Sequence, residues 1–324
     1  MEEKCMLYSF VIPCYKSSQT IEKVVRLTQE EMKRLGHGQV EFVLVNDCSP
    51  DQGATIRALK KLAGENPAVK VIDLAKNAGQ HNAIMAALNY VKGDVIIAMD
   101  DDMQTHPSQL SKLLDKYEEG YDVVFGYYPN KKHRAYRNLG AKLNSWIVRV
   151  MIGKPKSLHA SSFWVIRKYV RDEIIKYHYP YTYLEGLFLR TTNNITCVPI
   201  EHFEREVGQS GYNMKKLISL SSRTLGFSIT PLRISMVCGN IFAAVGLITA
   251  LVTIIRKILN PAMTAGWASM FAGICFFSGI ILVFLGMIGE YIGRMFLSLT
   301  NTPQYVIREF ISSEENGSQE DEKN

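Results

Sequence analysis

The first two thirds of the chain alternate between short apolar runs and longer segments with helical spacing. Apolar runs of strand length occupy residues 7–14, 40–46, 69–74 and 121–126, and one more ends at Asp100. Helical spacing occupies residues 21–35, 51–64 and 80–92 and a segment that starts beside Pro107. Strands that alternate with helices form a mostly parallel sheet with crossover helices. The pattern therefore predicts an α/β domain, and such sheets bind ligands at the carboxyl ends of their strands.

The last third of the chain has a different pattern. No charged residue occurs at 234–255 or at 267–288, and each run has the roughly 20 residues that span a hydrocarbon core. We therefore expect a hairpin of two transmembrane helices within residues 231–298, rather than a helical hairpin buried in a soluble core. Basic residues flank the outer ends of the hairpin more heavily than its connecting loop, which predicts that both ends are cytoplasmic. Glycines in both runs could let the helices pair closely or associate with another subunit as a homo-oligomer.

The remaining segments complete the predicted organisation. We expect residues 1–212 to form a cytoplasmic catalytic domain, because the N-terminus has no secretory signal. Residues 213–230 mix basic and apolar side chains, which is typical of an amphipathic segment on a membrane surface. Residues 135–152 could be a packed core helix or an interfacial helix, and the pattern leaves both open. Residues 299–324 are expected to be a cytoplasmic tail whose polar, acidic end is disordered.

Composition narrows the class of the protein. Of the 324 residues, 47% are hydrophobic and 21% are charged, which excludes a disordered chain. The net charge is +6, but the basic residues crowd towards the apolar last third and form no compact module with aromatic residues. Membrane lipids are therefore the expected partner, and nucleic acid is not. The 6 cysteines form no CxxC pair, so neither a zinc site nor a disulfide framework is indicated.

Three consecutive carboxylates, Asp100, Asp101 and Asp102, stand at the end of the apolar run that reaches Asp100. Asp100 and Asp102 are two residues apart, so on an extended backbone they point the same way, and Gln104 continues that face. Hard oxygen ligands of this kind bind Mg²⁺ or Mn²⁺. A solvated acidic turn is the alternative interpretation. The position directly after a buried type of strand favours the metal site.

The other predicted strand ends carry groups suited to a nucleotide diphosphate. Pro13 and Tyr15 follow the first run and can form a wall for a flat base. Asp47 follows the second run and can accept hydrogen bonds from a base or a ribose. Its spacing fits a helix N-cap equally well. Lys76 follows the third run at the start of a helix, where backbone N–H groups can face a phosphate.

Six motifs occur in an order that is typical of one family. They are Ser9–Tyr15, Asn46–Asp51, Asn77–Ala83, Asp100–Gln104, Glu204–Tyr212 and Gly289–Arg294. Together they resemble the polyprenyl-phosphate glycosyltransferases, which include bacterial undecaprenyl-phosphate sugar transferases and dolichol-phosphate mannose synthases. The resemblance runs from about residue 7 to residue 308. It implies a family-2 GT-A fold, which is Rossmann-like, followed by amphipathic juxtamembrane helices and two membrane helices in the bacterial cytoplasmic membrane.

The resemblance also implies roles for the donor side of the site. Asp100, Asp102 and Gln104 match the metal ligands of the family, and Asp102 would be catalytic through that metal. Pro13 and Asp47 match its nucleotide pocket.

On the acceptor side, Arg205 matches an arginine that meets the donor or acceptor phosphate, which would make it catalytic. Ser210 and Tyr212 lie in the same phosphate-binding loop. Where many relatives have an acidic residue, this chain has Ala160–Trp164 without a carboxylate. A catalytic base at that position is therefore not expected.

The implied reaction is an inverting, metal-dependent transfer of a sugar from a nucleotide sugar, with a UDP-sugar expected, to polyprenyl (undecaprenyl) phosphate. A phosphate monoester has a second pKa of about 6, so the acceptor is already anionic near neutral pH and needs no strong base. Two alternatives remain open. One is a processive polysaccharide synthase, although the chain lacks the Gln-x-x-Arg-Trp motif of those enzymes. The other is a catalytically inert membrane scaffold with a nucleotide-binding domain.

Overall fold

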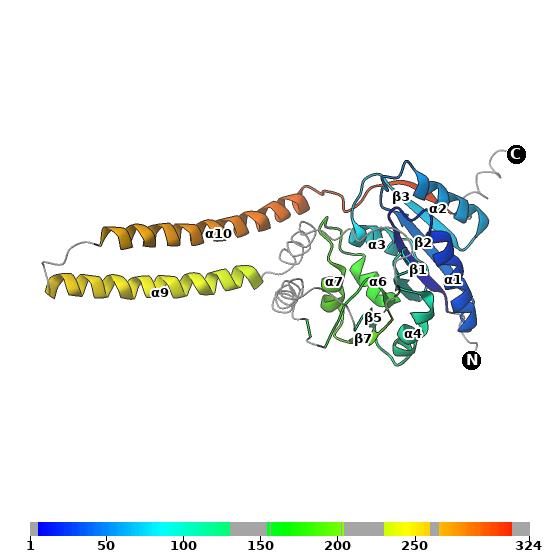
Figure 1. The fold of residues 1–324 in the computed structure, drawn as a ribbon, viewed down its shortest axis with the longest axis horizontal. Helices are drawn as coiled ribbons and strands as arrows, with labels where there is room; N and C mark the ends of the chain where they lie inside the picture. The colour runs from blue at the N-terminus through cyan, green and yellow to red at the C-terminus, as the bar shows by residue number, and fades with distance from the viewer. Residues whose placement is uncertain are drawn as a thin grey trace.

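The computed structural model describes residues 6–129, 154–155, 157–201, 203, 230–259 and 266–312. An α/β domain and a pair of long helices that extend from it make up this part of the chain (Figure 1). The segments 135–152 and 213–229, for which surface helices were considered, lie outside the described residues, as does the tail from residue 313.

The described elements follow the predicted alternation closely at first. The strands are β1 (Tyr8–Cys14), β2 (Val40–Asn46), β3 (Val69–Leu74), β4 (Val95–Ala98), β5 (Val123–Tyr127), β6 (Trp164–Arg167), β7 (Ile195–Pro199) and β8 (Ile307–Ile311). The helices are α1 (Ile21–Arg34), α2 (Ala54–Glu65), α3 (Gln80–Leu88), the 3₁₀ turn η1 (Pro107–Gln109), α4 (Leu110–Glu118), α6 (Lys168–Ile174), α7 (Leu184–Thr191), α9 (Thr230–Leu259) and α10 (Trp267–Leu299).

The strands form one mixed sheet in the order β7-β5-β6-β4-β1-β2-β3-β8. Its centre is parallel, because β1 pairs in parallel with both β2 and β4, and β2 pairs in parallel with β3. Two strands run the other way: β6 is antiparallel to β4 and β5, and β8 is antiparallel to β3. The predicted mostly parallel α/β sheet is confirmed. The sheet also contains β6, β7 and β8, which the apolar pattern does not predict.

Helices cover both faces of the sheet, and this explains the unbroken apolar strands. On one face Phe10 stacks on Phe42 with ring centroids 5.2 Å apart, in a core that includes side chains of α1, α2 and α4. On the other face Val11 packs in a second core with side chains of α3, α6 and α7. A strand that is buried on both sides reads as a continuous hydrophobic run. The core thus holds the ends of β1, β2, β3 and β4 at one rigid edge.

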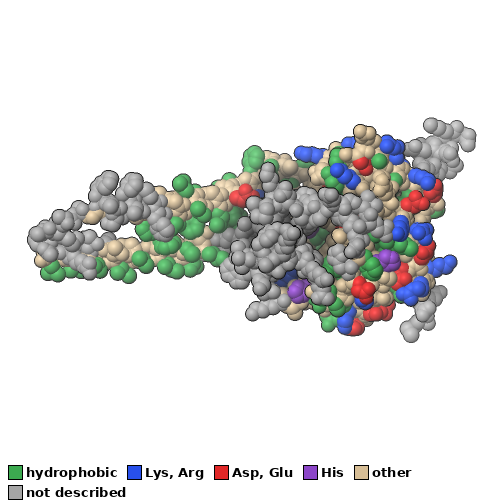
Figure 2. All heavy atoms as spheres, in the orientation of Figure 1, with side chains coloured by type: hydrophobic (Ala, Val, Ile, Leu, Met, Phe, Trp, Pro, Cys, Tyr) green, Lys and Arg blue, Asp and Glu red, His purple; other side chains and the backbone are tan. Residues whose placement is uncertain are grey.

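The two long helices form a hairpin. Helix α9 has 30 residues and α10 has 33. They are in contact where the ring centroids of Phe242 and Phe277 lie 6.0 Å apart and where the Ser235 hydroxyl donates to the Met287 sulfur at 3.4 Å. Hydrophobic side chains cover the hairpin, whereas charged side chains gather on the α/β domain (Figure 2). Among the described residues, one segment, Phe277–Leu299, is long and apolar enough to cross a membrane, and α9 contributes a shorter apolar stretch, Ile234–Gly246. The second predicted span therefore stays a prediction.

The C-terminal segment departs from the predicted organisation. Residues 299–324 were expected to be a tail separate from the catalytic domain, but β8 returns to the sheet and pairs along β3. Phe310 stacks on Tyr90 with ring centroids 4.8 Å apart. The chain therefore leaves the α/β domain for the hairpin and then comes back to complete the edge of its sheet.

Candidate active site

The three carboxylates after β4 make different contacts. The Gln80 amide donates a hydrogen bond of 2.8 Å to one oxygen of Asp100, and the Ser162 hydroxyl donates to the other. Asp101 accepts the backbone N–H of Tyr15 at 3.0 Å, so it ties this turn to the end of β1. Asp102 accepts the backbone N–H of Gln104 at 3.0 Å. The predicted cluster therefore forms, with each carboxylate held by its own donor.

Burial opposes the ionisation of two of these carboxylates, Asp100 and Asp101. Burial raises the pKa of Asp100 to about 7 against the lowering effect of the Ser162 hydrogen bond, and the charges of Asp102 and Asp101 contribute to the rise. Burial likewise raises the pKa of Asp101 to about 6, against the opposing hydrogen bond from the Tyr15 N–H. Like charges that share a buried site disfavour one another. A divalent cation would remove that cost.

The donor set fits Mg²⁺ or Mn²⁺. Both carboxylates that the sequence assigns to the metal, Asp100 and Asp102, lie in the cluster and interact electrostatically. Gln104 donates its backbone N–H to Asp102. Within the described residues no group of three or more His, Cys, Asp and Glu side chains has metal-binding geometry. Both ions accept water and phosphate oxygens in the remaining positions.

Asp47 holds a loop together. Its two carboxylate oxygens accept the backbone N–H groups of Ala78 at 2.6 Å and Gly79 at 3.0 Å, and the Asn77 amide donates to its carbonyl oxygen at 3.0 Å. The side chain is 4% exposed. The N-cap alternative is wrong, because Asp51 accepts the N–H of Thr55 at the start of α2 instead. Asp47 therefore shapes the loop after β3 that carries Lys76.

The groups predicted to meet the nucleotide border this edge. Pro13, the last residue but one of β1, is half-buried, and Tyr15 is 50% exposed. The Lys16 ammonium lies 5.9 Å from the centroid of the Tyr15 ring. Lys76 is exposed in the loop that Asp47 holds. Arg205, Ser210 and Tyr212, predicted for the acceptor, lie outside the described residues, so their roles stay predictions.

A network of hydrogen bonds around Asp73 supports the loops at the same strand ends. The Asn46 amide donates to Asp73 at 2.6 Å, and the Arg308 guanidinium donates to the other oxygen of Asp73 at 3.1 Å. Asn46 also accepts the backbone N–H of Ser49 at 3.2 Å. Arg308 further donates to the carbonyl of Ala75 at 3.2 Å. Strand β8 thus contacts the loop after β3 directly and is linked to the end of β2 through Asp73.

Sequence reasoning missed three side chains at this edge. Gln80 lies in one of the six motifs, but the resemblance assigns it no role, and Ser162 lies in the segment without a carboxylate. The Tyr128 hydroxyl bonds that of Thr105, and burial raises its pKa to about 12, with the charges of Asp100 and Asp102 adding to the effect. Ser162 had a signal, because it lies in the segment where many relatives carry an acid. Tyr128 had no such signal, because it follows β5 and is far along the chain from the carboxylates that it approaches.

Comparisons with known proteins agree with this architecture. The chain matches the family described as glycosyl transferase family 2 over residues 9–175 and the GtrB C-terminal hairpin over residues 230–295.

Curated relatives include two enzymes named undecaprenyl-phosphate 4-deoxy-4-formamido-L-arabinose transferase. The one from Enterobacter sp. (strain 638) is 31% identical over 309 residues, which cover 94% of this chain and 93% of the relative. The one from Klebsiella pneumoniae (strain 342) is 30% identical over 319 residues, which cover 97% of each.

Among solved structures, one similar chain is glucosyl-3-phosphoglycerate synthase from Mycobacterium tuberculosis in complex with Mn²⁺, UDP and phosphoglyceric acid. It is 19% identical with a TM-score of 0.45 and covers 68% of this chain and 77% of that one. At that level of similarity we infer nothing about activity from it.

Proposed function

The chain belongs to glycosyl transferase family 2 and is a glycosyltransferase, and from that premise we propose that it transfers a sugar from a nucleotide sugar to polyprenyl (undecaprenyl) phosphate. The observation that carries the proposal is the carboxylate cluster of Asp100, Asp101 and Asp102, in a chain that also contains a membrane-type hairpin. A nucleotide sugar is a cytosolic solute, whereas a polyprenyl chain stays in the bilayer at about 0.8 kcal/mol for each buried CH₂. An enzyme that joins them needs both parts.

On the donor side, the side chains hold and orient the nucleotide. Pro13 and Tyr15 wall the base, and the loop held by Asp47 presents Lys76 to negative charge. Asp100 and Asp102 would hold Mg²⁺ or Mn²⁺. A bound cation neutralises charge on the nucleotide diphosphate and so makes it a better leaving group.

On the acceptor side, the proposed reaction is a single displacement. An oxygen of the lipid phosphate attacks the anomeric carbon, and the bond from that carbon to the nucleotide diphosphate breaks and leaves its electron pair on the diphosphate. Arg205, Ser210 and Tyr212 would orient the acceptor phosphate, with Arg205 binding it bidentately. Attack from the opposite face inverts the anomeric carbon, so an α-linked donor yields a β-linked lipid.

No carboxylate base is required for this step. The acceptor phosphate is already anionic, since its second pKa is about 6. In the structure Ser162 donates its hydrogen bond to Asp100, so the position without a carboxylate helps to hold the cluster. We assign Ser162 a positioning role there.

The membrane arrangement is part of the proposal. We infer that α9 crosses the membrane as α10 does, which makes the chain a multi-pass protein of the bacterial cytoplasmic membrane with its catalytic domain in the cytoplasm. The match to a C-terminal hairpin over residues 230–295 supports this topology. The many glycines of the two helices would also allow association with the hairpin of a second copy.

The test is sugar transfer by the full-length chain in vesicles that contain undecaprenyl phosphate. The donors are radiolabelled UDP-glucose, UDP-N-acetylglucosamine, GDP-mannose and UDP-4-deoxy-4-formamido-L-arabinose, and the product is a labelled lipid extracted into organic solvent. We expect one donor to give a labelled lipid with one sugar per phosphate. A labelled polymer would instead indicate a processive synthase, and no product with any donor would favour an inert scaffold.

Two variants test the proposed cation site. Asp102→Asn should abolish transfer while the protein stays folded. Asp115→Asn, which changes an exposed carboxylate on α4, should leave transfer intact. Full turnover in excess chelator would show that the cluster serves no cation.

A further inference from the structure

Residues 177–183 form a loop that is unusually rich in tyrosine, which we call the tyrosine loop. It reads Tyr-His-Tyr-Pro-Tyr-Thr-Tyr and leads directly into α7. Two of its side chains, Tyr179 and Tyr181, are 51% and 38% exposed. Large aromatic side chains at neighbouring positions form an amphipathic surface, apolar over the rings and polar at the hydroxyl groups. Nothing in the proposed transfer reaction uses it.

The tyrosine loop lies at the same edge of the sheet as the carboxylate cluster. The Asn82 amide, in the first turn of α3, donates to the carbonyl of Pro180 at 3.0 Å. The Tyr183 ring lies 6.0 Å from that of His81, the neighbour of Asn82. Helix α3 begins just after the carboxyl end of β3, and its first residue, Gln80, donates to Asp100. The loop is therefore attached to the elements that build the candidate active site.

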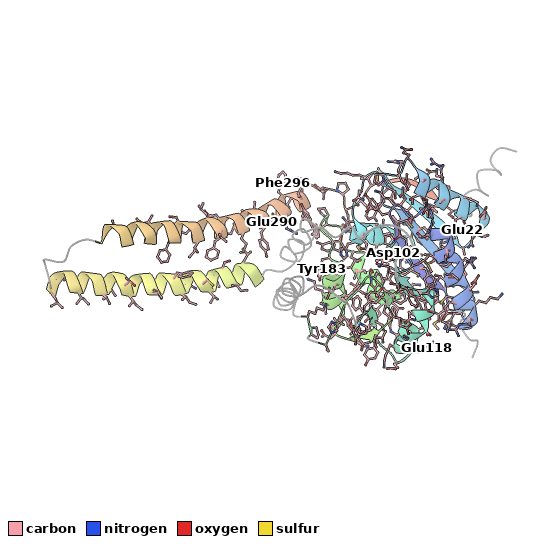
Figure 3. The ribbon with its side chains drawn as sticks, in the orientation of Figure 1. Glu22, Asp102, Glu118, Tyr183, Glu290 and Phe296 are labelled. Atoms are coloured by element: carbon pink, nitrogen blue, oxygen red, sulfur yellow. The ribbon has the colours of Figure 1, made fainter. Side chains whose placement is uncertain are left out.

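The tyrosine loop also contacts the segment that leaves the hairpin. The Arg294 guanidinium lies 4.6 Å from the centroid of the Tyr181 ring and pairs with Glu290 at 2.8 Å. Beyond α10, the Gln304 amide donates to the carbonyl of Tyr179 at 3.0 Å and to the Thr182 hydroxyl at 2.5 Å. Figure 3 shows Tyr183 on the side of the domain that faces the hairpin and Glu290 and Phe296 on the turns of α10 next to the domain.

The length of α10 places these contacts at the membrane surface. With 33 residues the helix is about 50 Å long, whereas the hydrocarbon core is about 30 Å thick. The uncharged run of α10 ends at residue 288, so when residues 267–288 span the core the excess length falls in the last turns, which then lie in the headgroup region. The ion pair of Glu290 with Arg294 fits that level, because charged groups avoid the hydrocarbon and tyrosine rings gather at the interface. Ile292 and Phe296, in the same turns, remain 59% and 62% exposed as an apolar surface.

We propose that the tyrosine loop lies in the lipid headgroup region of the bilayer, and that Tyr179 and Tyr181 hold the active-site edge of the sheet at the membrane surface. The inference rests on the proposed insertion of α10 and is independent of which sugar is transferred. A hollow of about 320 Å³ between the loop and residues 298–305 supports it. Its lining includes His178, Asn301 and Thr302, which suit a polar headgroup rather than an acyl chain.

The experiment places a photoreactive phenylalanine analogue at single positions of the full-length chain in vesicles with fluorescent phosphatidylethanolamine. Position 179 tests the tyrosine loop. Position 169 is the matched control, because Tyr169 is 45% exposed but lies on α6. The start of α6 contacts Asp94, which precedes β4 and so lies at the end of that strand opposite the carboxylate cluster. Position 281 reports insertion of α10, where Ile281 is 57% exposed.

We expect lipid adducts at positions 179 and 281 and only background at position 169. An adduct at 281 with none at 179 would overturn the inference while leaving the hairpin in the membrane. A protein dimer as the adduct at 179 would also overturn it, because the loop would then face a second copy. Absence of lipid at 281 would refute the membrane topology on which both proposals rest, and equal adducts at 169 and 179 would remove the specific role of the loop.

A second measurement separates this role from catalysis. Tyr179→Ser should lower transfer to undecaprenyl phosphate in vesicles but leave transfer to a short-chain prenyl phosphate in detergent unchanged. An equal loss with both acceptors would contradict the inference.

Discussion

The Arg308→Met variant should weaken both folding and nucleotide binding, because Arg308 connects the last strand to the donor site. Its guanidinium lies 3.1 Å from a carboxylate oxygen of Asp73, which is only 3% exposed, and 3.2 Å from the carbonyl of Ala75. Asp73 in turn binds Asn46 at 2.6 Å. Methionine keeps the apolar stem of the side chain and removes the charge, so the change is confined to these hydrogen bonds.

The magnitude follows from the burial of the two partners. A hydrogen bond to a charged group contributes about 1.5–3 kcal/mol, and a buried acceptor that loses its donor bears a desolvation cost. The Arg308 side chain is 57% exposed, so solvent screens part of this interaction. We therefore expect a loss of about 1–2 kcal/mol in the free energy of unfolding. The loops that contain Asp47 and Lys76 lose a support, so the KM for the donor should rise while kcat changes less.

The matched control is Glu309→Gln, the next residue on the same strand. Glu309 pairs with Lys60 at 2.7 Å, and both side chains are 45% exposed. An exposed pair contributes about 0–1 kcal/mol, and its loss leaves the contacts of Asp73 intact. Thermal unfolding of the full-length protein and calorimetric titration with UDP would measure both effects. Equal losses of stability and of UDP affinity in the two variants would refute the reasoning, because β8 would then only cover the sheet edge.

Further predictions concern the charged groups of the domain. The pKa of Asp100 is raised to about 7 from a reference near 3.9, so the metal-free protein should lose stability by at most about 1.4 kcal/mol per pH unit as the pH rises through that window. Asp100→Asn should remove this loss in unfolding scans with chelator. A stability difference between the variant and the original protein that does not change with pH would contradict this. Lys70→Met should cost about 3–5 kcal/mol, because Lys70 and Glu41 form a buried pair at 2.7 Å. Burial acts to raise the pKa of Glu41, but hydrogen bonds led by that of Lys70 outweigh it and lower the pKa, so this stability is present above about pH 4.3 and is lost as the pH falls through the lowered value; a denaturant midpoint that Lys70→Met leaves unchanged would oppose this. Arg205→Ala should reduce kcat/KM far more than Arg149→Ala, which changes a basic residue of the segment 135–152. A residue that orients the acceptor phosphate acts in the transition state, whereas a cation that only attracts the membrane adds about 1 kcal/mol; equal losses would count against the acceptor role.

Much of the α/β domain could be predicted because its elements have local signatures. The strands 40–46 and 69–74 were predicted with the bounds that β2 and β3 have, since strands covered on both faces read as unbroken apolar runs. Strands β6 and β8 have only 4 and 5 residues, and β8 is largely half-buried or exposed, so neither stands out from its surroundings. Their places depend on pairing with strands far away in the chain.

The candidate site divides in the same way. The identity of Asp100, Asp102 and Asp47 as the polar groups at strand ends follows from local sequence, because a strand of known direction delivers the next residues to a known edge. Local sequence does not determine which hydrogen-bond donors these carboxylates contact. Asp47 could be a cap or a ligand by spacing, and only the packing of the loop after β3 decides that it binds Ala78 and Gly79.

By itself, the sequence determined the order of the elements from β1 to β5, the strand ends at which the carboxylates gather and the apolar hairpin, because each depends on neighbours a few residues apart. Tertiary structure alone decided the contacts that join these parts. Arg308 reaches Asp73 across 235 positions, and Gln304 reaches Thr182 across 122. Such contacts depend on the registers of strands and on where helix α10 releases the chain. No local pattern encodes them, since their energy appears only when both segments are already in place.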